Sequence, residues 1–216
     1  MFISFEGADG AGKSTQAAYL IERLKAAGRP ALYVREPGGT PVGEELRRIL
    51  KSGGNISPLT ELLMFEAARA ELVEKIIRPA LERGEVVVAD RFADSSVAYQ
   101  AYGRGLPVQE VHALNRAATG GLAPDLTFLL DLPYEAAVIR SSGRDRAGPA
   151  SAGALGQARR RFEDAPDDFH RRVVEGYRAI ARAEPTRWAV IDATRPEGEV
   201  AEEVWAHVRR RLALVR

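Results

Sequence analysis

The residues from Gly7 to Ser14 have the types and the spacing of a phosphate-binding loop. They read GADGAGKS and fit the pattern G-x-x-x-x-G-K-[ST] in full. The loop follows the apolar run Met1–Phe5 and precedes a helical pattern, which is the context in which this motif binds nucleotides. Glycine lets the backbone approach a phosphate closely, and successive N–H groups then form a concave anion site. The motif predicts a nucleoside triphosphate with Mg²⁺.

Two side chains of this loop carry the expected chemistry. Lys13 would place its charge on the β- and γ-phosphates, and the Ser14 hydroxyl would ligate Mg²⁺. The positive end of the following helix adds to the anion site. An ordinary glycine-rich turn is the alternative, but it would not need Lys13. The residues expected to contact the triphosphate are Gly7, Ala8, Asp9, Gly10, Ala11, Gly12, Lys13, Ser14 and Thr15.

A second polar position follows the continuous apolar run Val86–Ala89, which is typical of a strand buried on both faces. The run ends at Asp90, whose carboxylate can hold magnesium directly or through water. A helix N-cap is the alternative role for Asp90. Arg91 then points into the same cleft, where it could hold a second phosphoryl group, or it forms a surface ion pair of little energetic value.

These positions need a fold that brings strand ends together. Apolar runs predict strands at 2–6, 31–35, 86–90, 126–131 and 188–192, with helical patterns between them. Such alternation predicts an α/β fold, in which a parallel sheet carries helices on both faces. With 216 residues and no linker, the chain is expected to form one domain. The polar ends of the first three strands should converge on one cleft.

Composition excludes several classes of protein. Cysteine is absent, which rules out disulfides, thiol catalysis and cysteine–zinc sites and agrees with a cytoplasmic location. The net charge is +1, from 31 basic and 30 acidic residues, so no nucleic-acid partner is expected. No apolar run is long enough to span a bilayer, and no signal-peptide pattern begins the chain. We therefore expect no membrane partner.

The segment Ser141–Gln157 is rich in Gly, Ala and Ser and has few large apolar groups. Six arginines and one aspartate lie between positions 140 and 161. The segment is either a solvated surface loop or a lid that brings arginines over the triphosphate. Long loops in compact domains are often functional, which favours a lid over about 141–160.

A phosphoryl transferase also needs a site for an acceptor. Arg35 ends the second predicted strand, and Phe65 and Arg69 lie four residues apart on one helix face. An aromatic ring can stack on a base, and a guanidinium can donate to a base carbonyl. The alternative is that Phe65 belongs to the core.

Together these segments resemble the thymidylate kinase family. The resemblance rests on the loop GADGAGKST, REPGGT from Arg35, LLMFEAAR from Leu62, DRFADSSVAYQ from Asp90, and PDLT from Pro124 leading into LLDL. It covers residues 2 to about 140 and resumes at Arg161. It implies a three-layer, five-stranded parallel sheet of order 2-3-1-4-5 and a homodimer. It also implies transfer of the γ-phosphoryl group of ATP to dTMP, giving dTDP and ADP for dTTP biosynthesis.

The resemblance further implies roles for individual residues in dTMP binding. Arg35 and Arg91 would hold the dTMP phosphate, with Glu36 as a partner of the arginines. Phe65 would stack on thymine, and Arg69 would reach a thymine carbonyl. The remaining expected contacts are Ser95, Ser96 near the N3 edge of the base with Gln100 close by, Tyr99 against the 2′ position, and Asp9 near the sugar and phosphate.

The chain departs from the family in its lid. Some members carry an arginine within the loop, where this chain has Asp9-Gly10-Ala11, so the catalytic cation is expected from the lid. The family's Asp-Arg-x-Glu pattern is only partly present, at Arg161-Phe162-Glu163. The candidate cations are Arg140, Arg144, Arg146 and Arg161, and the sequence does not choose among them. The expected catalytic set is Lys13, Asp9, Arg35, Arg91, Arg146 and Arg161.

Three other functions compete with this interpretation. Another nucleoside monophosphate or deoxynucleoside kinase would share the loop and Asp90 and differ in the base pocket. A GTPase or a partner-driving ATPase would hydrolyse triphosphate without an acceptor, but none of the four lysines is followed two residues later by aspartate, as guanine recognition would require. A nucleotide-binding module without turnover is the third alternative.

Overall fold

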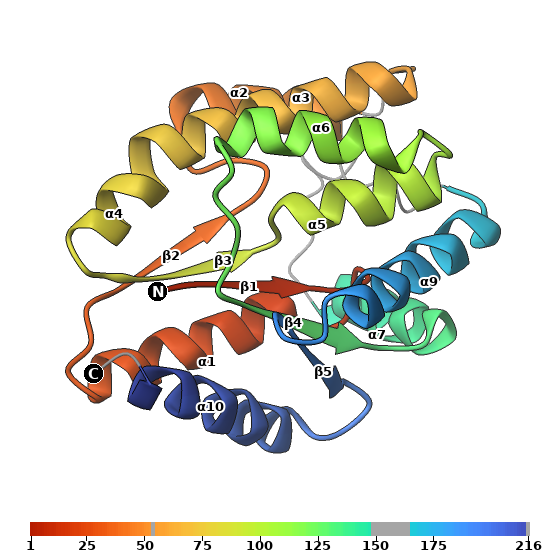
Figure 1. The fold of residues 1–216 in the computed structure, drawn as a ribbon. Coiled ribbons are helices and arrows are strands. Elements are labelled where there is room, and N and C mark those ends of the chain that lie inside the picture. Colours follow the sequence, from red (N-terminus) through yellow and green to blue (C-terminus); the bar gives the residue numbers. More distant parts are fainter. Residues whose placement is uncertain (53–54, 148–164, 215–216) are drawn as a thin grey trace.

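The computed structural model describes residues 1–52, 55–147 and 165–214, with the backbone alone at 141–147 and 214. Figure 1 shows the arrangement of the elements. The strands are β1 (Phe2–Glu6), β2 (Ala31–Arg35), β3 (Val86–Asp90), β4 (Leu126–Asp131) and β5 (Trp188–Asp192). The α-helices are α1 (Lys13–Ala26), α2 (Pro41–Lys51), α3 (Pro58–Leu72), α4 (Arg78–Glu82), α5 (Ala93–Ser96), α6 (Val108–Thr119), α7 (Tyr134–Ala147), α9 (Asp167–Ala183) and α10 (Glu197–Leu214). Two π-helical segments, η1 (Val73–Ile77) and η2 (Val97–Gly103), continue α3 and α5.

The five strands form one parallel sheet in the order β2-β3-β1-β4-β5. This confirms the predicted fold class, strand order and strand ranges. The register pairs Phe5 with Asp90, and Arg35 with Asp90. The carboxyl ends of β1, β2 and β3 therefore lie side by side, so the phosphate loop, the Arg35 turn and the Asp90-Arg91 segment leave the sheet at one edge.

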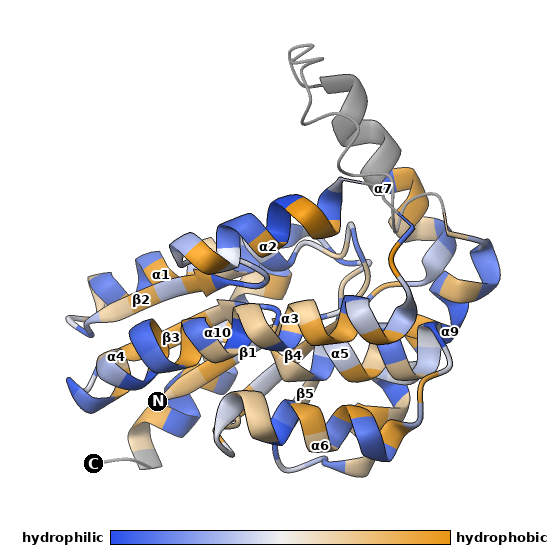
Figure 2. Ribbon diagram, turned by 90° about the horizontal axis from the view of Figure 1, so that it is seen from above, coloured by the Kyte–Doolittle hydropathy of each residue, from blue (hydrophilic) through white to orange (hydrophobic). Residues whose placement is uncertain are grey.

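Helices cover both faces of the sheet (Figure 1). On one face, α1 and α10 pack together and bury Phe5, Leu20 and Val204 in a common core. On the other face lie α3, α4, α5, α6 and α9, with two further clusters around Phe92 and Tyr177. The strands are mostly in hydrophobic colours in Figure 2, as expected for a sheet enclosed by two helical layers.

The helices differ in how they begin. Thr40 caps α2 by accepting from Gly43 N at 3.0 Å, and Ser57 caps α3 by accepting from Thr60 N at 3.3 Å. The N-cap of α1 is Gly12, in the left-handed region at φ 94°, and it has no side chain that could cap the helix. The first N–H groups of α1 are thus left for an external anion.

The helix α7 differs in length from the prediction. The sequence pattern predicts a helix over 134–141, but α7 runs to Ala147. The expected lid over 141–160 therefore begins as helical backbone, and its remainder, 148–160, lies outside the described residues. Within the described ranges, no helix is both long and apolar enough to cross a membrane.

Candidate active site

The phosphate loop has a backbone that requires glycine. Gly7, Gly10 and Gly12 have φ angles of 135°, 88° and 94°. A Cβ atom at Gly7 would lie 2.7 Å from the carbonyl oxygen of Leu130, so a side chain there would clash with backbone. The Lys13 ammonium donates to the carbonyl oxygens of Gly7 at 3.0 Å and Ala8 at 2.8 Å. The Lys13 side chain thus lies against the same loop with which it is expected to bind phosphate.

Several charges meet at Lys13. Burial lowers the pKa of Lys13 to about 8, and the nearby Arg91 guanidinium lowers it further, while Asp9 and Asp90 act in the opposite direction. Burial is thus the main obstacle to the charge on Lys13, and added negative charge beside the ammonium would offset it. A bound triphosphate would supply that charge.

Ser14 and Asp90 lie together where β3 ends. The Ser14 hydroxyl donates to the Asp90 carboxylate, and the Tyr33 hydroxyl donates to the same oxygen at 3.4 Å. Hydroxyl and carboxylate oxygens are ligands that Mg²⁺ prefers, usually completed by substrate phosphates and water. Among the described residues, no group of three or more His, Cys, Asp and Glu side chains could hold a metal ion. A metal at Ser14 and Asp90 would therefore depend on oxygens from a ligand.

Arg91 is held in place by hydroxyl groups. It has a positive φ of 73°, its N–H donates to the Phe5 carbonyl oxygen at 3.0 Å, and its side chain is 16% exposed. The guanidinium donates to one carboxylate and three hydroxyls: Asp9 at 2.7 Å, Tyr99 at 3.1 Å, Ser95 at 3.2 Å and Tyr177 at 3.0 Å. It also lies over the Tyr99 ring, 5.0 Å from the centroid. The contact with Asp9 ties Arg91 to the phosphate loop.

Asp9 is the carboxylate that balances this arrangement. Desolvation raises the pKa of Asp9, but Arg91 and Lys13 together hold it well below its usual range. The Tyr99 hydroxyl also donates to Asp9, at 3.3 Å. The side chain of Asp9 is 56% exposed, so it faces the cleft as an ionised acceptor.

A buried carboxylate supports these hydroxyls. Glu6 ends β1 and accepts from Phe92 N at 2.7 Å, Ser95 Oγ at 2.6 Å and Tyr177 hydroxyl at 2.9 Å. Burial raises the pKa of Glu6 to about 7, and the nearby Asp94 raises it further. Sequence reasoning missed Glu6 and Tyr177. An acid at the end of an apolar strand is the signal that identified Asp90, and it could have identified Glu6 as well.

The guanidinium of Arg69 is enclosed by protein. Its exposed fraction is 1%. It donates to Glu36 at 2.9 Å and Glu66 at 2.6 Å, and also to Asn115 at 2.9 Å and Ser96 at 3.1 Å. Despite this cation, burial raises the pKa of Glu36 to about 7. Arg69 thus joins the REPGGT turn, α3, α5 and α6, and its contact with a thymine carbonyl stays a prediction.

The other residues expected at the base lie on the same two elements. Phe65 is half-buried on α3. Gln100 is buried in η2 and donates from Nε2 to Glu61 at 3.0 Å, and Glu61 also accepts from Arg104. The structure therefore brings Phe65, Arg69, Ser96 and Gln100 to the contact between α3 and α5–η2. Their roles toward a base stay predictions.

The Arg35 turn carries a second arginine that sequence reasoning missed. Arg35 is half exposed and donates to Glu44 at 3.4 Å, and Glu44 also accepts from Gly39 N at 2.9 Å. Arg47, on α2, donates to the Pro37 carbonyl oxygen at 2.7 Å. Burial lowers the pKa of Arg47, and Arg35 lowers it further, so the two cations are close neighbours. No sequence motif marked Arg47, because its position depends on how α2 folds back on the turn.

One of the four lid candidates has a described side chain. Arg140 donates to the carbonyl oxygens of Ala193 at 2.7 Å and Thr194 at 3.3 Å, so it joins α7 to the loop after β5. The side chains of Arg144 and Arg146, and the whole of Arg161, lie outside the described residues. The choice of the catalytic lid cation is left open.

Comparisons with known proteins agree with this geometry. The sequence model of the thymidylate kinase family matches residues 5–204. The chain belongs to the thymidylate kinase family. It is 50% identical over 207 residues to the thymidylate kinase of Thermomicrobium roseum, covering 96% of this chain and 93% of that protein. It is 47% identical over 212 residues to that of Deinococcus radiodurans, covering 98% and 97%.

A solved thymidylate kinase also matches in three dimensions. The crystal structure of thymidylate kinase from Ehrlichia chaffeensis superposes with a TM-score of 0.74 at 33% identity, covering 96% of this chain and 98% of that one. The resemblance inferred from five sequence motifs is confirmed over nearly the whole chain.

Proposed function

We infer that this thymidylate kinase family member transfers the γ-phosphoryl group of ATP to dTMP, giving dTDP and ADP for dTTP biosynthesis. The observation that carries the inference is the direct contact between the two halves of the cleft. Arg91, the expected acceptor-phosphate cation, donates at 2.7 Å to Asp9 within the donor loop. Two anions bound at these positions would face each other, as phosphoryl transfer requires.

The described residues supply positioning and charge. The uncapped N–H groups of α1 and the Lys13 ammonium would hold the donor phosphates. Arg91 and Arg35 would hold the acceptor phosphate. A loose transition state places charge on the transferred oxygens and needs little proton abstraction from an acceptor phosphate. The cations of the cleft, rather than a general base, therefore supply the described part of the catalysis.

Magnesium fits the donor site. Ser14 and Asp90 place two hard oxygen ligands next to the loop. Mg²⁺ bound there would neutralise charge on the β- and γ-phosphate oxygens. The two residues would hold the ion from the protein side, and ATP would complete its coordination.

The sugar side of the acceptor site is expected at Tyr99. Its ring is buried and packs edge-on against Phe169 and Tyr177, with centroids 6.1 and 6.3 Å away. Its hydroxyl is fixed between Arg91 and Asp9. Because its ring is packed and its hydroxyl is hydrogen-bonded, Tyr99 cannot move aside for a 2′-hydroxyl. Deoxyribonucleotides should therefore be preferred.

The test is a substrate panel under one set of conditions. ADP formation from ATP should be fastest with dTMP and slower with dGMP, dCMP, UMP and thymidine. Calorimetry should show that dTMP binds to the folded protein. Faster turnover of dGMP or of a nucleoside would mean that the site belongs to another kinase class.

A homodimer is also proposed. Helices α2, α3 and α6 lie next to one another (Figure 1) and expose five large apolar side chains: Val42, Ile49, Leu59, Leu63 and Val108. Exposed apolar side chains gathered on neighbouring helices favour an interaction site there. Light scattering should give a dimer mass for the wild type and a lower mass for Leu59→Glu/Leu63→Glu. A cytoplasmic location and the lack of a nucleic-acid partner stay predictions.

A further inference from the structure

Two stripes of side chains face each other across the expected base site. On α3 the residues of one stripe recur every four positions, which places them on one helix face. A second stripe recurs every four positions along α5–η2. The first stripe is Glu61, Phe65 and Arg69, and the second is Ser96, Gln100 and Arg104.

The stripes are joined at both ends. Arg69, late in α3, donates to Ser96 at 3.1 Å. Glu61, early in α3, accepts from Gln100 at 3.0 Å. The two elements thus run in opposite directions, and Phe65 lies midway between the two connections.

Glu61 is an unusual residue to find at this contact. Its exposed fraction is 0%, and it lies outside every motif that identified the site. Its Oε1 atom accepts from Gln100 Nε2 at 3.0 Å and Arg104 Nε at 3.2 Å, and its Oε2 atom accepts from Arg104 Nη2 at 3.1 Å. Arg104 is itself anchored over the Phe169 ring, 4.6 Å from the centroid. The guanidinium thus contacts both oxygens of this buried carboxylate.

The carboxylate paired with Arg104 determines how the Gln100 amide points. A carboxylate only accepts hydrogen bonds, whereas an amide has a donor end and an acceptor end. Gln100 must therefore turn its NH₂ group toward Glu61 and its Oε1 atom away from Glu61. Among the described residues, we find no hydrogen bond to Oε1. The amide is thus fixed with its acceptor end directed away from Glu61.

We propose that Glu61 is a positioning residue that sets the base specificity of the acceptor site by holding Gln100 with its carbonyl oxygen toward the pyrimidine. This inference rests on the proposed dTMP kinase function. Thymine and uracil carry an N3–H donor, which the Gln100 oxygen accepts. Cytosine carries an unprotonated N3, whose lone pair would face that oxygen and leave two buried acceptors unpaired. The site thereby selects a pyrimidine with two carbonyls.

The main test is Glu61→Gln, measured as the ratio of kcat/KM for dTMP to that for dCMP. The introduced amide can donate as well as accept, so the Gln100 amide is free to turn over. The ratio should fall about tenfold, mainly through faster reaction of dCMP. The ratio of dTMP to dUMP should stay within about twofold of its wild-type value, because both bases carry the same N3–H.

Two further variants separate orientation from structure. Arg104→Lys changes the packing on the Phe169 ring but keeps a cation beside Glu61, so it should keep the dTMP/dCMP ratio of the wild type. The exchange variant Glu61→Gln/Gln100→Glu again places an obligate acceptor toward the base, so it should restore the preference for dTMP. If Glu61→Gln does not fold, Glu61→Gln/Arg104→Gln removes the unpaired guanidinium and provides the same measurement.

The outcomes distinguish this inference from the function on which it rests. A wild-type protein that fails to phosphorylate dTMP would refute the proposed function. An active wild type whose dTMP/dCMP ratio is unchanged in Glu61→Gln would refute only the role of Glu61. A ratio that falls equally in Arg104→Lys would also refute it, because a general loss of packing would then explain both variants.

Discussion

Arg91 and Arg69 are both guanidinium groups held by several hydrogen bonds, but the charges around them differ. Arg69 is paired with two buried carboxylates, those of Glu36 and Glu66, at 2.8 and 2.6 Å. Arg91 is held mainly by neutral hydroxyls, and its direct ionic partner, Asp9, is 56% exposed. The charge of Arg69 is thus paired with two buried carboxylates, whereas the one carboxylate that Arg91 contacts directly is exposed, which favours a role for Arg91 toward a bound anion.

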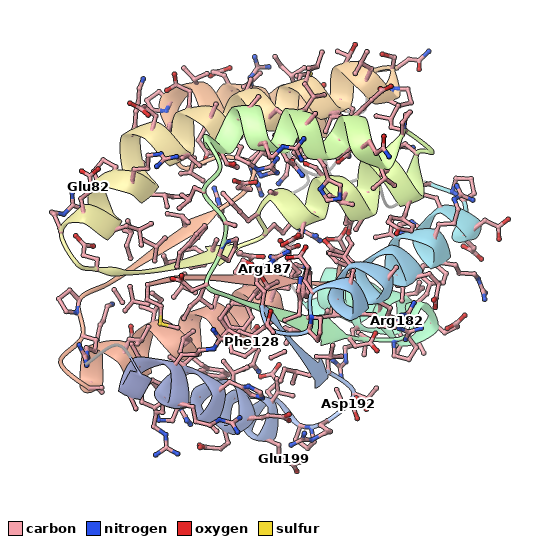
Figure 3. All side chains as sticks on the ribbon, viewed as in Figure 1. Glu82, Phe128, Arg182, Arg187, Asp192 and Glu199 are labelled. Atoms are coloured by element: carbon pink, nitrogen blue, oxygen red, sulfur yellow. The ribbon has the colours of Figure 1, made fainter. Side chains whose placement is uncertain are left out.

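This difference separates two uses of arginine in one cleft. A dianionic phosphate is attracted by a cation whose charge is not already neutralised, and hydroxyl partners fix geometry without removing that charge. A cation enclosed by carboxylates instead joins elements that must keep their relative positions. Arg187 (labelled in Figure 3) belongs to the second type, because it pairs with the buried Asp94 at 2.6 Å and links β5 to α5.

Replacing Arg91 should give the largest kinetic effect. In Arg91→Ala, kcat/KM for dTMP should fall about 10³-fold, because the acceptor phosphate loses a preorganised cation. ATP affinity and the free energy of unfolding should change little, since the partners left behind are mostly hydroxyls that water can satisfy. Steady-state kinetics and urea denaturation measure these quantities. A large loss of stability with normal kcat/KM would place Arg91 in the same class as Arg69.

Replacing Arg69 should instead act on stability. Arg69→Met leaves two buried carboxylates without their cation, which costs about 3–5 kcal/mol of unfolding free energy. Arg69→Met/Glu36→Gln/Glu66→Gln removes those charges as well and should recover most of the loss. Urea denaturation at pH 8 measures both. The single variant should also discriminate less well between thymine and other bases, because the expected contact with a thymine carbonyl is lost.

Lys13 extends the comparison to the donor side. Its hydrogen-bond partners among the described residues are two carbonyl oxygens rather than a carboxylate, so a bound phosphate could pair with it directly. In Lys13→Ala, kcat should fall about 10²-fold or more, because a charge matched to the transition state is lost. Lys25→Ala, at the exposed end of the same helix, is the matched control and should leave kcat unchanged. A Lys13→Ala variant with unchanged kcat would contradict the assignment of the loop.

The sequence was sufficient to predict the residues of this site that lie at or just after the ends of strands. Lys13, Asp90 and Arg91 all follow buried apolar strands, and a parallel sheet brings such strand ends to one edge whatever the packing of the helices. The strand ranges were predicted correctly for the same reason, because a strand enclosed by two helical layers is apolar along its whole length.

The sequence was not sufficient to predict the residues that contact these side chains from other helices. Tyr177 contacts Arg91 across 86 positions in the chain, and Glu61 contacts Gln100 across 39. Each of these contacts depends on how two helices pack, and the periodicity of either helix shows only that one face is buried. Helix packing also determines which carboxylates contact each arginine. This is the difference between Arg91 and Arg69, and the sequence alone does not predict it.

The hydroxyl network predicts a dependence of stability on pH. The pKa of Glu6 is about 7 in the folded protein, above the ordinary value of 4.5. Between these two values the folded state binds the proton more strongly, so this group's contribution to stability is present at low pH and is lost as the pH rises toward 7. In Glu6→Gln the free energy of unfolding should fall less between pH 5 and pH 8, by about 2 kcal/mol. An unchanged pH profile would mean that Glu6 is not protonated in this range.

The smallest effect expected is that of the Tyr177 hydroxyl. Tyr177→Phe removes one donor–acceptor group between Glu6 and Arg91 and keeps the ring in its buried packing. The KM for dTMP should rise about fivefold with kcat and the KM for ATP nearly unchanged, since one neutral hydrogen bond contributes about 1 kcal/mol. Tyr134→Phe, which removes a hydroxyl bonded to Asp167 on the surface, is the matched control. Equal changes in both KM values would show that the hydroxyl supports the fold rather than Arg91. A selective change would show that neutral partners position this cation for the acceptor phosphate.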